Sequence, residues 1–160
     1  MVYVLDTNIF RKLLDHFPKK GKHFEKVWEA LDFAIANGTV VSVDECFNEI
    51  DKHYSTDSDN YLWIAKRKAI FLKPTNAESI IISNLFKNPK MMESVHTKNI
   101  VDNRPAADVY LVAKAKALNA TVVTVEAYKP HSAQIPNICE AIDVPCISYD
   151  DFMEILPDTM

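Results

Sequence analysis

The sequence predicts an α/β fold: a central, mostly parallel β-sheet of about four to five short strands, flanked by helices on both faces. Short runs of β-branched residues alternate along the chain with longer segments whose apolar residues recur at helical spacing. The strand-like runs are largely apolar, which is typical of strands buried on both faces. No repeat or linker interrupts this order. We therefore expect residues 1–160 to form a single domain.

Each expected element follows from its local pattern. The first strand stops abruptly at Asp6, and Gly38 ends the first clear helix. Ser42 and Thr75 each precede a Glu by three residues, which is the signature of a capping box at a helix start. Pro105 suits the entry to a helix. The expected strands are residues 2–5, 39–43, 121–125 and 144–148. The expected helices are residues 24–35, 43–54, 61–72, 75–86, 106–118, 136–142 and 150–156. Residues 87–103 show weak periodicity, and no more than a turn of helix is expected there.

Composition excludes several classes of protein. With 48% hydrophobic and 25% charged residues, the chain has the composition of a folded globular protein, not of a disordered one. No apolar run approaches the roughly 18–20 residues of a membrane span, and the N-terminus lacks the pattern of a secretory signal. The three cysteines fit neither a disulfide framework nor a zinc site. We expect a cytoplasmic protein with no membrane segment.

The net charge of −4 argues against a protein that coats nucleic acid by bulk electrostatics. It is compatible with a nuclease, because such an enzyme gathers carboxylates to bind divalent metal ions.

Three acidic residues stand at positions where a parallel sheet places its ligands. Asp6 directly follows the first expected strand and Glu126 the third, and ligands bind beyond the carboxyl ends of such strands. Asp108 begins a helix and points along its apolar stripe, where an unpaired charge is costly. Metal ions would satisfy all three groups. Each residue also has an alternative explanation of its own. Asp6 could cap the next helix, the charge of Asp108 could interact favourably with the helix dipole, and Glu126 could be a solvated loop residue. The apolar stripe of the helix that begins at Asp108 comprises Leu111, Val112, Ala115 and Leu118.

Four segments resemble PIN-domain nucleases in the family's order. Val4–Phe10 (VLDTNIF) resembles the opening of these proteins, and Ala107–Ala115 their later Asp-x-x-Ile-x-Ala-x-Ala segment. Thr121–Glu126 resembles their strand ending in Thr-x-Asp, with Glu126 in place of the usual Asp. Tyr149–Phe152 resembles the start of the closing helix. The resemblance implies a PIN-like fold.

The resemblance also implies a catalytic site in which carboxylates bind Mg²⁺ or Mn²⁺, ions that prefer oxygen ligands. Glu49 is assigned because the family's Glu stands in the middle of the helix after the second strand. Glu45 and Asp51 are nearby rivals for that role, and Asp102 is a rival of Asp108. The implied catalytic and metal-binding residues are Asp6, Glu49, Asp108 and Glu126.

Neutral and basic residues complete the prediction. Thr7, Asn8 and Thr124 are placed to orient ligands or phosphate, or else serve only turns and caps. Tyr61 and Trp63 could stack on bases, although helical aromatics usually belong to the core. Basic residues between positions 11 and 22 could contact RNA, or form a solvated surface, as could the run 66–68. The basic residues between positions 11 and 22 that are expected to contact RNA are Arg11, Lys12, Lys19, Lys20 and Lys22.

Through the resemblance, we expect a metal-dependent endoribonuclease that acts as the toxin of a toxin–antitoxin pair of the VapC type. Its expected partners are an RNA substrate, a small antitoxin and a second copy of the chain. The alternative is a catalytically silent nucleic-acid-binding or scaffold module, which the Glu126 departure leaves open. A haloacid-dehalogenase phosphatase needs Asp-x-Asp, but Asn8 holds the third position. A receiver domain needs adjacent acidic residues where Asp6 stands alone.

Overall fold

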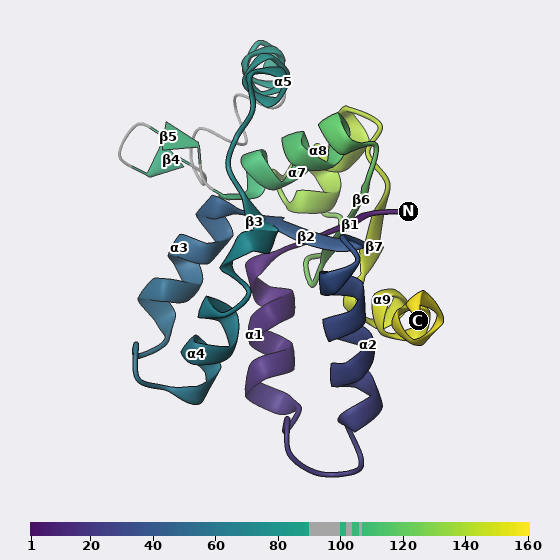
Figure 1. Ribbon diagram of the computed structural model, residues 1–160. Coiled ribbons are helices and arrows are strands. Elements are labelled where there is room, and N and C mark those ends of the chain that lie inside the picture. The colour runs from purple at the N-terminus through teal and green to yellow at the C-terminus, as the bar shows by residue number, and fades with distance from the viewer. Residues whose placement is uncertain (90–99, 102–103, 106) are drawn as a thin grey trace.

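A five-stranded, all-parallel sheet forms the centre of the molecule (Figure 1). The computed structural model describes residues 1–89, 100–101, 104–105 and 107–160. The strand order is β3-β2-β1-β6-β7. These strands are β1 (Tyr3–Leu5), β2 (Val40–Val43), β3 (Phe71–Leu72), β6 (Thr121–Thr124) and β7 (Cys146–Ser148). A separate antiparallel pair is formed by β4 (Ile100–Val101) and β5 (Arg104–Pro105). The α/β prediction is confirmed.

Helices cover both faces of the sheet, with α1 and α2 on one face and α7 and α8 on the other (Figure 1). The described helices are α1 (Thr7–His16), α2 (Glu25–Ala36), α3 (Asp44–His53), α4 (Asp59–Ala65), α5 (Asn76–Phe86), α7 (Ala107–Leu118), α8 (Ile135–Ala141) and α9 (Tyr149–Ile155). No described helix is long and apolar enough to cross a membrane.

The central position of β1 determines where the site lies. Tyr3 pairs with Val40 of β2 on one side and with Thr121 of β6 on the other. The chain builds β2 and β3 outward from β1, then returns to add β6 and β7 on the opposite side. The carboxyl ends of β1 and β6 therefore meet at a topological switch point, which is where open α/β sheets bind ligands.

Strand β1 is buried because both of its faces are covered. Val4 and Leu5 are fully buried, and Tyr3 packs edge-on against Phe152 of α9. The helix that follows β1 buries Ile9, Phe10, Leu13 and Leu14. Because β1 and α1 are held in this core, the residues at their junction have little freedom to move away from the carboxyl edge of the sheet.

Two expected helices differ in the structure. Ser42 does not cap α3; instead its hydroxyl donates to the Leu5 carbonyl at 2.7 Å and joins β2 to β1. The expected helix 61–72 is divided into α4, a 3-10 turn at Lys68–Ile70, and strand β3. Burial of Ile70 and Phe71 in the core explains this change, because it extends the sheet by one strand. The capping box at Thr75 is confirmed.

Other differences are smaller. Helix α1 has no counterpart among the expected elements, which leave residues 7–16 unassigned. Leu118, expected within the apolar stripe of its helix, is 44% exposed, whereas Val112 and Ala115 are fully buried. Pro105 lies in β5 and not in the first turn of α7. Most of 87–103, for which little structure is expected, lies outside the described residues.

Candidate metal centre at the carboxyl edge of the sheet

Asp6 occupies the junction between β1 and α1 and is only 4% exposed. It stands at the N-cap of α1, yet its side chain makes no capping hydrogen bond. Instead, the Thr124 hydroxyl, at the end of β6, donates to Asp6 Oδ2 at 3.2 Å. The backbone N–H of Asp6 donates to the Val123 carbonyl at 3.1 Å and prolongs the β1–β6 ladder. The carboxylate is thus directed to the neighbouring strand, so helix capping does not explain its presence here.

Glu49 approaches the same edge from α3. The hydroxyl of Thr7, in the first turn of α1, donates to Glu49 Oε2 at 2.7 Å. Thr7 is buried and Glu49 is exposed. The threonine therefore fixes a solvent-facing carboxylate beside the buried Asp6. Asn8, the third expected residue of this turn, is half-buried.

Glu126 lies two residues beyond β6 and is half-buried. Its backbone N–H donates to Thr124 Oγ1 at 3.1 Å, while its Oε2 accepts from the Ile135 N–H, at the start of α8, at 2.8 Å. Thr124 thus contacts both Asp6 and Glu126. The backbone donor of Ile135 is the contact that sequence reasoning missed. The nearby Pro136 marks a helix start, but no side-chain type signals which N–H will meet the carboxylate.

Electrostatics connect all four expected carboxylates. Burial raises the pKa of Asp6 to about 7, and the charges of Asp108, Glu126 and Glu49 act in the same direction. The hydrogen bond from Thr124 opposes this rise. Asp108 is half-buried in the first turn of α7. Each of the three other carboxylates is therefore close enough to Asp6 to penalise its ionisation.

The donor set suits a divalent cation. All four groups offer carboxylate oxygens, the ligands that Mg²⁺ and Mn²⁺ prefer. A cation would offset both the burial and the carboxylate repulsion that raise the pKa of Asp6. In the part of the chain that the structure describes, no three His, Cys, Asp or Glu side chains are already gathered at metal-ligand spacing.

Residues 3–157 match a protein family described as a domain of unknown function (DUF4411). The chain belongs to this family. No curated protein matches the sequence of this DUF4411 chain.

Solved structures share the fold of this DUF4411 chain. The crystal structure of VapBC2 from Rickettsia felis, bound to a DNA fragment from their promoter, matches at a TM-score of 0.58 and 15% identity, covering 92% of this chain and 98% of that one. VapBC-1 from nontypeable Haemophilus influenzae gives 0.55 and 18%, covering 94% and 99%. FitAcB from Neisseria gonorrhoeae gives 0.54 and 19%, covering 92% and 98%. The fold is PIN-like, as the resemblance predicted.

Two of the three rival carboxylates of the DUF4411 chain have neighbours other than Asp6. The charges of Glu78 and Lys114 act on Glu45, whose half-buried position raises its pKa. Asp51 is exposed and interacts with Tyr61. Asp102 lies outside the described residues.

The expected RNA-contacting residues are dispersed. The Lys12 ammonium lies 4.2 Å from the centre of the Tyr149 ring. Arg11 is half-buried beside it in α1. Lys19, Lys20 and Lys22 lie beyond the far end of α1, in the loop that leads to α2. The aromatic residues Tyr61 and Trp63 are both half-buried in α4. These basic groups therefore do not form one surface around Asp6.

Proposed function

We propose that this protein is a metal-dependent endoribonuclease that hydrolyses RNA phosphodiester bonds and acts as the toxin of a toxin–antitoxin pair. The observation that carries the proposal is the position of Asp6, buried at the carboxyl edge of the sheet and close to three further carboxylates. Burying such a group costs stability unless a positive partner is present. Retaining it at a topological switch point is best explained by a function that needs the charge.

Asp6, Glu49, Asp108 and Glu126 would hold Mg²⁺ or Mn²⁺. When bound, the cation would supply polarisation of a water molecule and neutralisation of charge on the phosphodiester. The chain contributes positioning: Thr124 orients Asp6, and Thr7 orients Glu49. The Ile135 N–H donates to Oε2 of Glu126 and holds that side chain beside the start of α8. The longer arm of Glu126, compared with the family's usual Asp, is thus anchored.

The toxin role rests on the shared fold. The similar structures are of VapBC and FitAB assemblies, and one is bound to promoter DNA. From these assemblies we extend the expectation of a small antitoxin partner. A homodimer, which the resemblance to PIN-domain nucleases implies, and a cytoplasmic location are further parts of the proposal. A monomeric mass by light scattering would contradict the dimer.

The direct test is cleavage of a mixed RNA pool by purified protein that has been freed of any co-purified partner. We expect products only when Mg²⁺ or Mn²⁺ is present, and none after chelation. Metal-loaded protein that binds RNA without cutting it would instead support the catalytically silent module.

Glu49 and Glu45 provide a matched pair of variants on one helix. We expect Glu49→Gln to lower the cleavage rate at least about tenfold, because it removes a charge from the metal site. Glu45→Gln should leave the rate within about twofold. Initial rates at saturating Mg²⁺ measure both. Equal losses in the two variants would reject the assignment of Glu49.

Thr124 tests whether the orientation of Asp6 matters. Thr124→Val keeps the shape of the side chain but removes the hydroxyl that joins Asp6 and Glu126. We expect Mg²⁺ affinity to fall by about 10- to 100-fold, as for other groups that orient metal ligands. Calorimetric titration with Mg²⁺ measures this change. Thr121→Val, in the same strand, is the control, and an equal effect there would indicate general damage to β6.

A further inference from the structure

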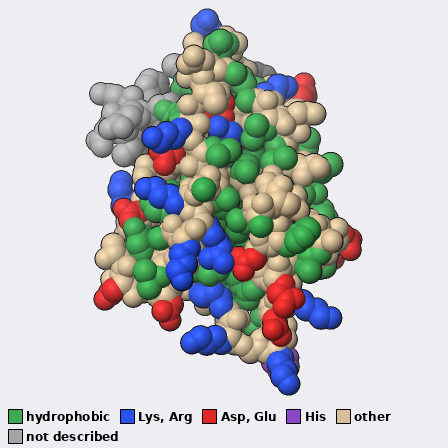
Figure 2. Space-filling model, viewed as in Figure 1, with side chains coloured by type: hydrophobic (Ala, Val, Ile, Leu, Met, Phe, Trp, Pro, Cys, Tyr) green, Lys and Arg blue, Asp and Glu red, His purple; other side chains and the backbone are tan. Residues whose placement is uncertain are grey.

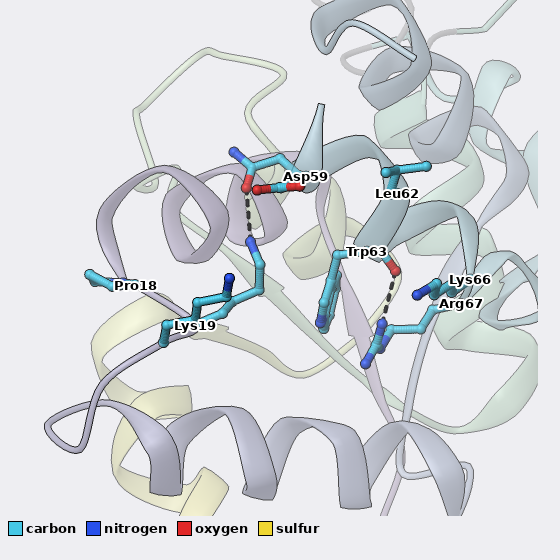
Figure 3. A pocket seen from close by; sticks show the side chains of 9 residues that line it. Pro18, Lys19, Asp59, Leu62, Trp63, Lys66 and Arg67 are labelled. Carbon is cyan, nitrogen blue, oxygen red and sulfur yellow. Dashed lines mark hydrogen bonds between the residues drawn. The ribbon is translucent and has the colours of Figure 1, made fainter. Parts of the chain in front are cut away.

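A pocket of about 590 Å³ lies away from the carboxylates, between the loop that follows α1 and helix α4 (Figure 3). Of its nine lining residues, four are cationic and one is acidic. The cations are Lys19, Lys20, Lys66 and Arg67, and the acid is Asp59. This excess of positive charge contrasts with the net charge of −4 for the whole chain. Figure 2 shows basic side chains gathered on this face, over the region where α1 and α4 lie in Figure 1.

Two of the cations are held in place. Arg67 lies with its guanidinium carbon 3.9 Å from the centre of the Trp63 ring, and its NH1 donates to the Trp63 carbonyl at 2.9 Å. It also pairs with Asp32 of α2 at 2.7 Å. Lys19 Nζ donates to Asn60 Oδ1 at 2.9 Å (Figure 3). Holding these groups in advance lowers the entropy that a ligand must lose on binding.

The other two cations are available to a ligand. Lys20 and Lys66 are exposed, and neither forms an ion pair with any residue that the structure describes. Burial lowers the pKa of Lys19; the charge of Asp59 opposes that change, and the charge of Arg67 adds to it. The pocket therefore combines a partly desolvated positive wall with free ammonium groups, an arrangement that attracts anions.

An apolar side of the pocket distinguishes it from a simple charged surface. Leu62 is 46% exposed, and the half-buried Trp63 points into the space between Lys19 and Arg67 (Figure 3). The Trp63 ring also packs edge-on against Trp28, with the two ring centres 5.2 Å apart. Aromatic and cationic side chains together are typical of grooves that bind single-stranded nucleic acid.

The distance from the carboxylates suits a short strand of stacked nucleotides. Asp6 precedes α1 and Pro18 follows it, so the ten-residue helix separates the two sites by roughly 14 Å along its axis. That length corresponds to about four stacked nucleotides at ~3.4 Å each. A site made of carboxylates repels phosphates until metal is bound, so a strand needs cations elsewhere to hold it.

We propose that this pocket binds a phosphate and the adjoining nucleotide of single-stranded RNA, about four nucleotides from the bond that is cut. The inference rests on the proposed ribonuclease function, but its test is binding, not cleavage. An acidic protein segment is the competing occupant of such a pocket, and it would leave the affinity for RNA independent of these lysines.

The test compares two double charge reversals, both in an Asp6→Asn background so that RNA stays intact. Lys20→Glu with Lys66→Glu changes the pocket, while Lys73→Glu with Lys87→Glu changes net charge equally at exposed positions elsewhere. Fluorescence anisotropy with an unstructured RNA of about 12 nucleotides gives the affinity and its dependence on salt. We expect the pocket variant to bind at least tenfold more weakly than the control. The slope of log affinity against log salt should fall by about 0.7, the value for the one phosphate that the pocket no longer neutralises.

Equal affinities and slopes in the two variants, or an absence of RNA binding by the parent protein, would overturn the proposal. The pocket and the nuclease function can fail separately. Weaker binding by the pocket variant, in a protein that never cleaves RNA, would retain the pocket and reject the nuclease. If the parent protein cleaves RNA but the pocket variant binds RNA as tightly as the control, the nuclease function is retained and the pocket proposal is rejected.

Discussion

Asp6→Asn is expected to abolish metal-dependent RNA cleavage while making the metal-free protein more stable at about pH 8. Asparagine keeps the size of the side chain and can still accept the hydrogen bond from Thr124. It removes the buried charge that Asp108, Glu126 and Glu49 repel. Cleavage should fall at least about 100-fold, because the substitution removes the buried ligand around which the other three gather.

The sign of the stability change follows from the pKa of Asp6. Its value is 3.8 for an ordinary Asp side chain and about 7 in the folded protein. Between pH 3.8 and about pH 7, Asp6 keeps a proton in the folded state that it has released in the unfolded state. The contribution of Asp6 to stability therefore falls as pH rises through this range. At ~1.4 kcal/mol per pH unit, the contribution lost by pH 8 is about 4 kcal/mol. Asp6→Asn removes this loss, so the two proteins should differ little at about pH 4 and most at about pH 8.

Urea denaturation of both proteins across this pH range, without metal, measures the difference. Adding Mg²⁺ at about pH 8 should raise the stability of the parent protein and leave that of Asp6→Asn nearly unchanged. Asp150→Asn, an exposed aspartate of α9, is the control, and neither its stability profile nor its cleavage rate should change. A variant that is inactive but less stable than the parent at every pH would contradict the argument, because loss of structure would then explain the inactivity.

The elements that sequence reasoning predicted well are those whose signal is local. The apolar run before Asp6 and the capping box at Thr75 depend on neighbours within a few residues, and both appear in the structure. The errors occur where a distant part of the chain decides. The Ser42 hydroxyl is used by the Leu5 carbonyl of another strand, so its cap signature does not act. Phe71 follows a helical pattern in the sequence. In the structure it pairs with Ser42 as part of a strand, because the outer edge of β2 offers unpaired backbone groups to β3.

The candidate site shows the same division. Asp6 and Glu126 could be predicted because strand ends are visible in the sequence. The choice of Glu49 over Glu45 could not be made from spacing, because it depends on which side of α3 faces Thr7. The basic pocket could not be predicted either. It joins residues 18–20 to residues 59–67, and the segments meet only after α1, α2 and α4 have packed.

The largest loss of stability is expected at Lys114, in the helix that carries Asp108. Lys114 and Glu78 form an ion pair at 2.7 Å with side chains only 4% and 2% exposed. Lys114 Nζ also donates to the Lys73 carbonyl at 2.9 Å, and Glu78 closes the capping box of α5. Lys114→Met would leave the Glu78 charge buried without its partner, so we expect a loss of about 3–5 kcal/mol in the free energy of unfolding.

Two further variants separate this pair from a general effect of replacing lysine. Lys116→Met, two positions along α7, removes an exposed hydrogen bond to the Ile142 carbonyl and should cost about 1 kcal/mol. Lys114→Met combined with Glu78→Leu removes both charges, and we expect it to be more stable than Lys114→Met alone, because no unpaired carboxylate remains buried. Urea denaturation of the set measures all three. If Lys114→Met costs no more than Lys116→Met, the buried pair does not hold α5 against α7, and Asp108 must owe its position to the packing of α7 on the sheet.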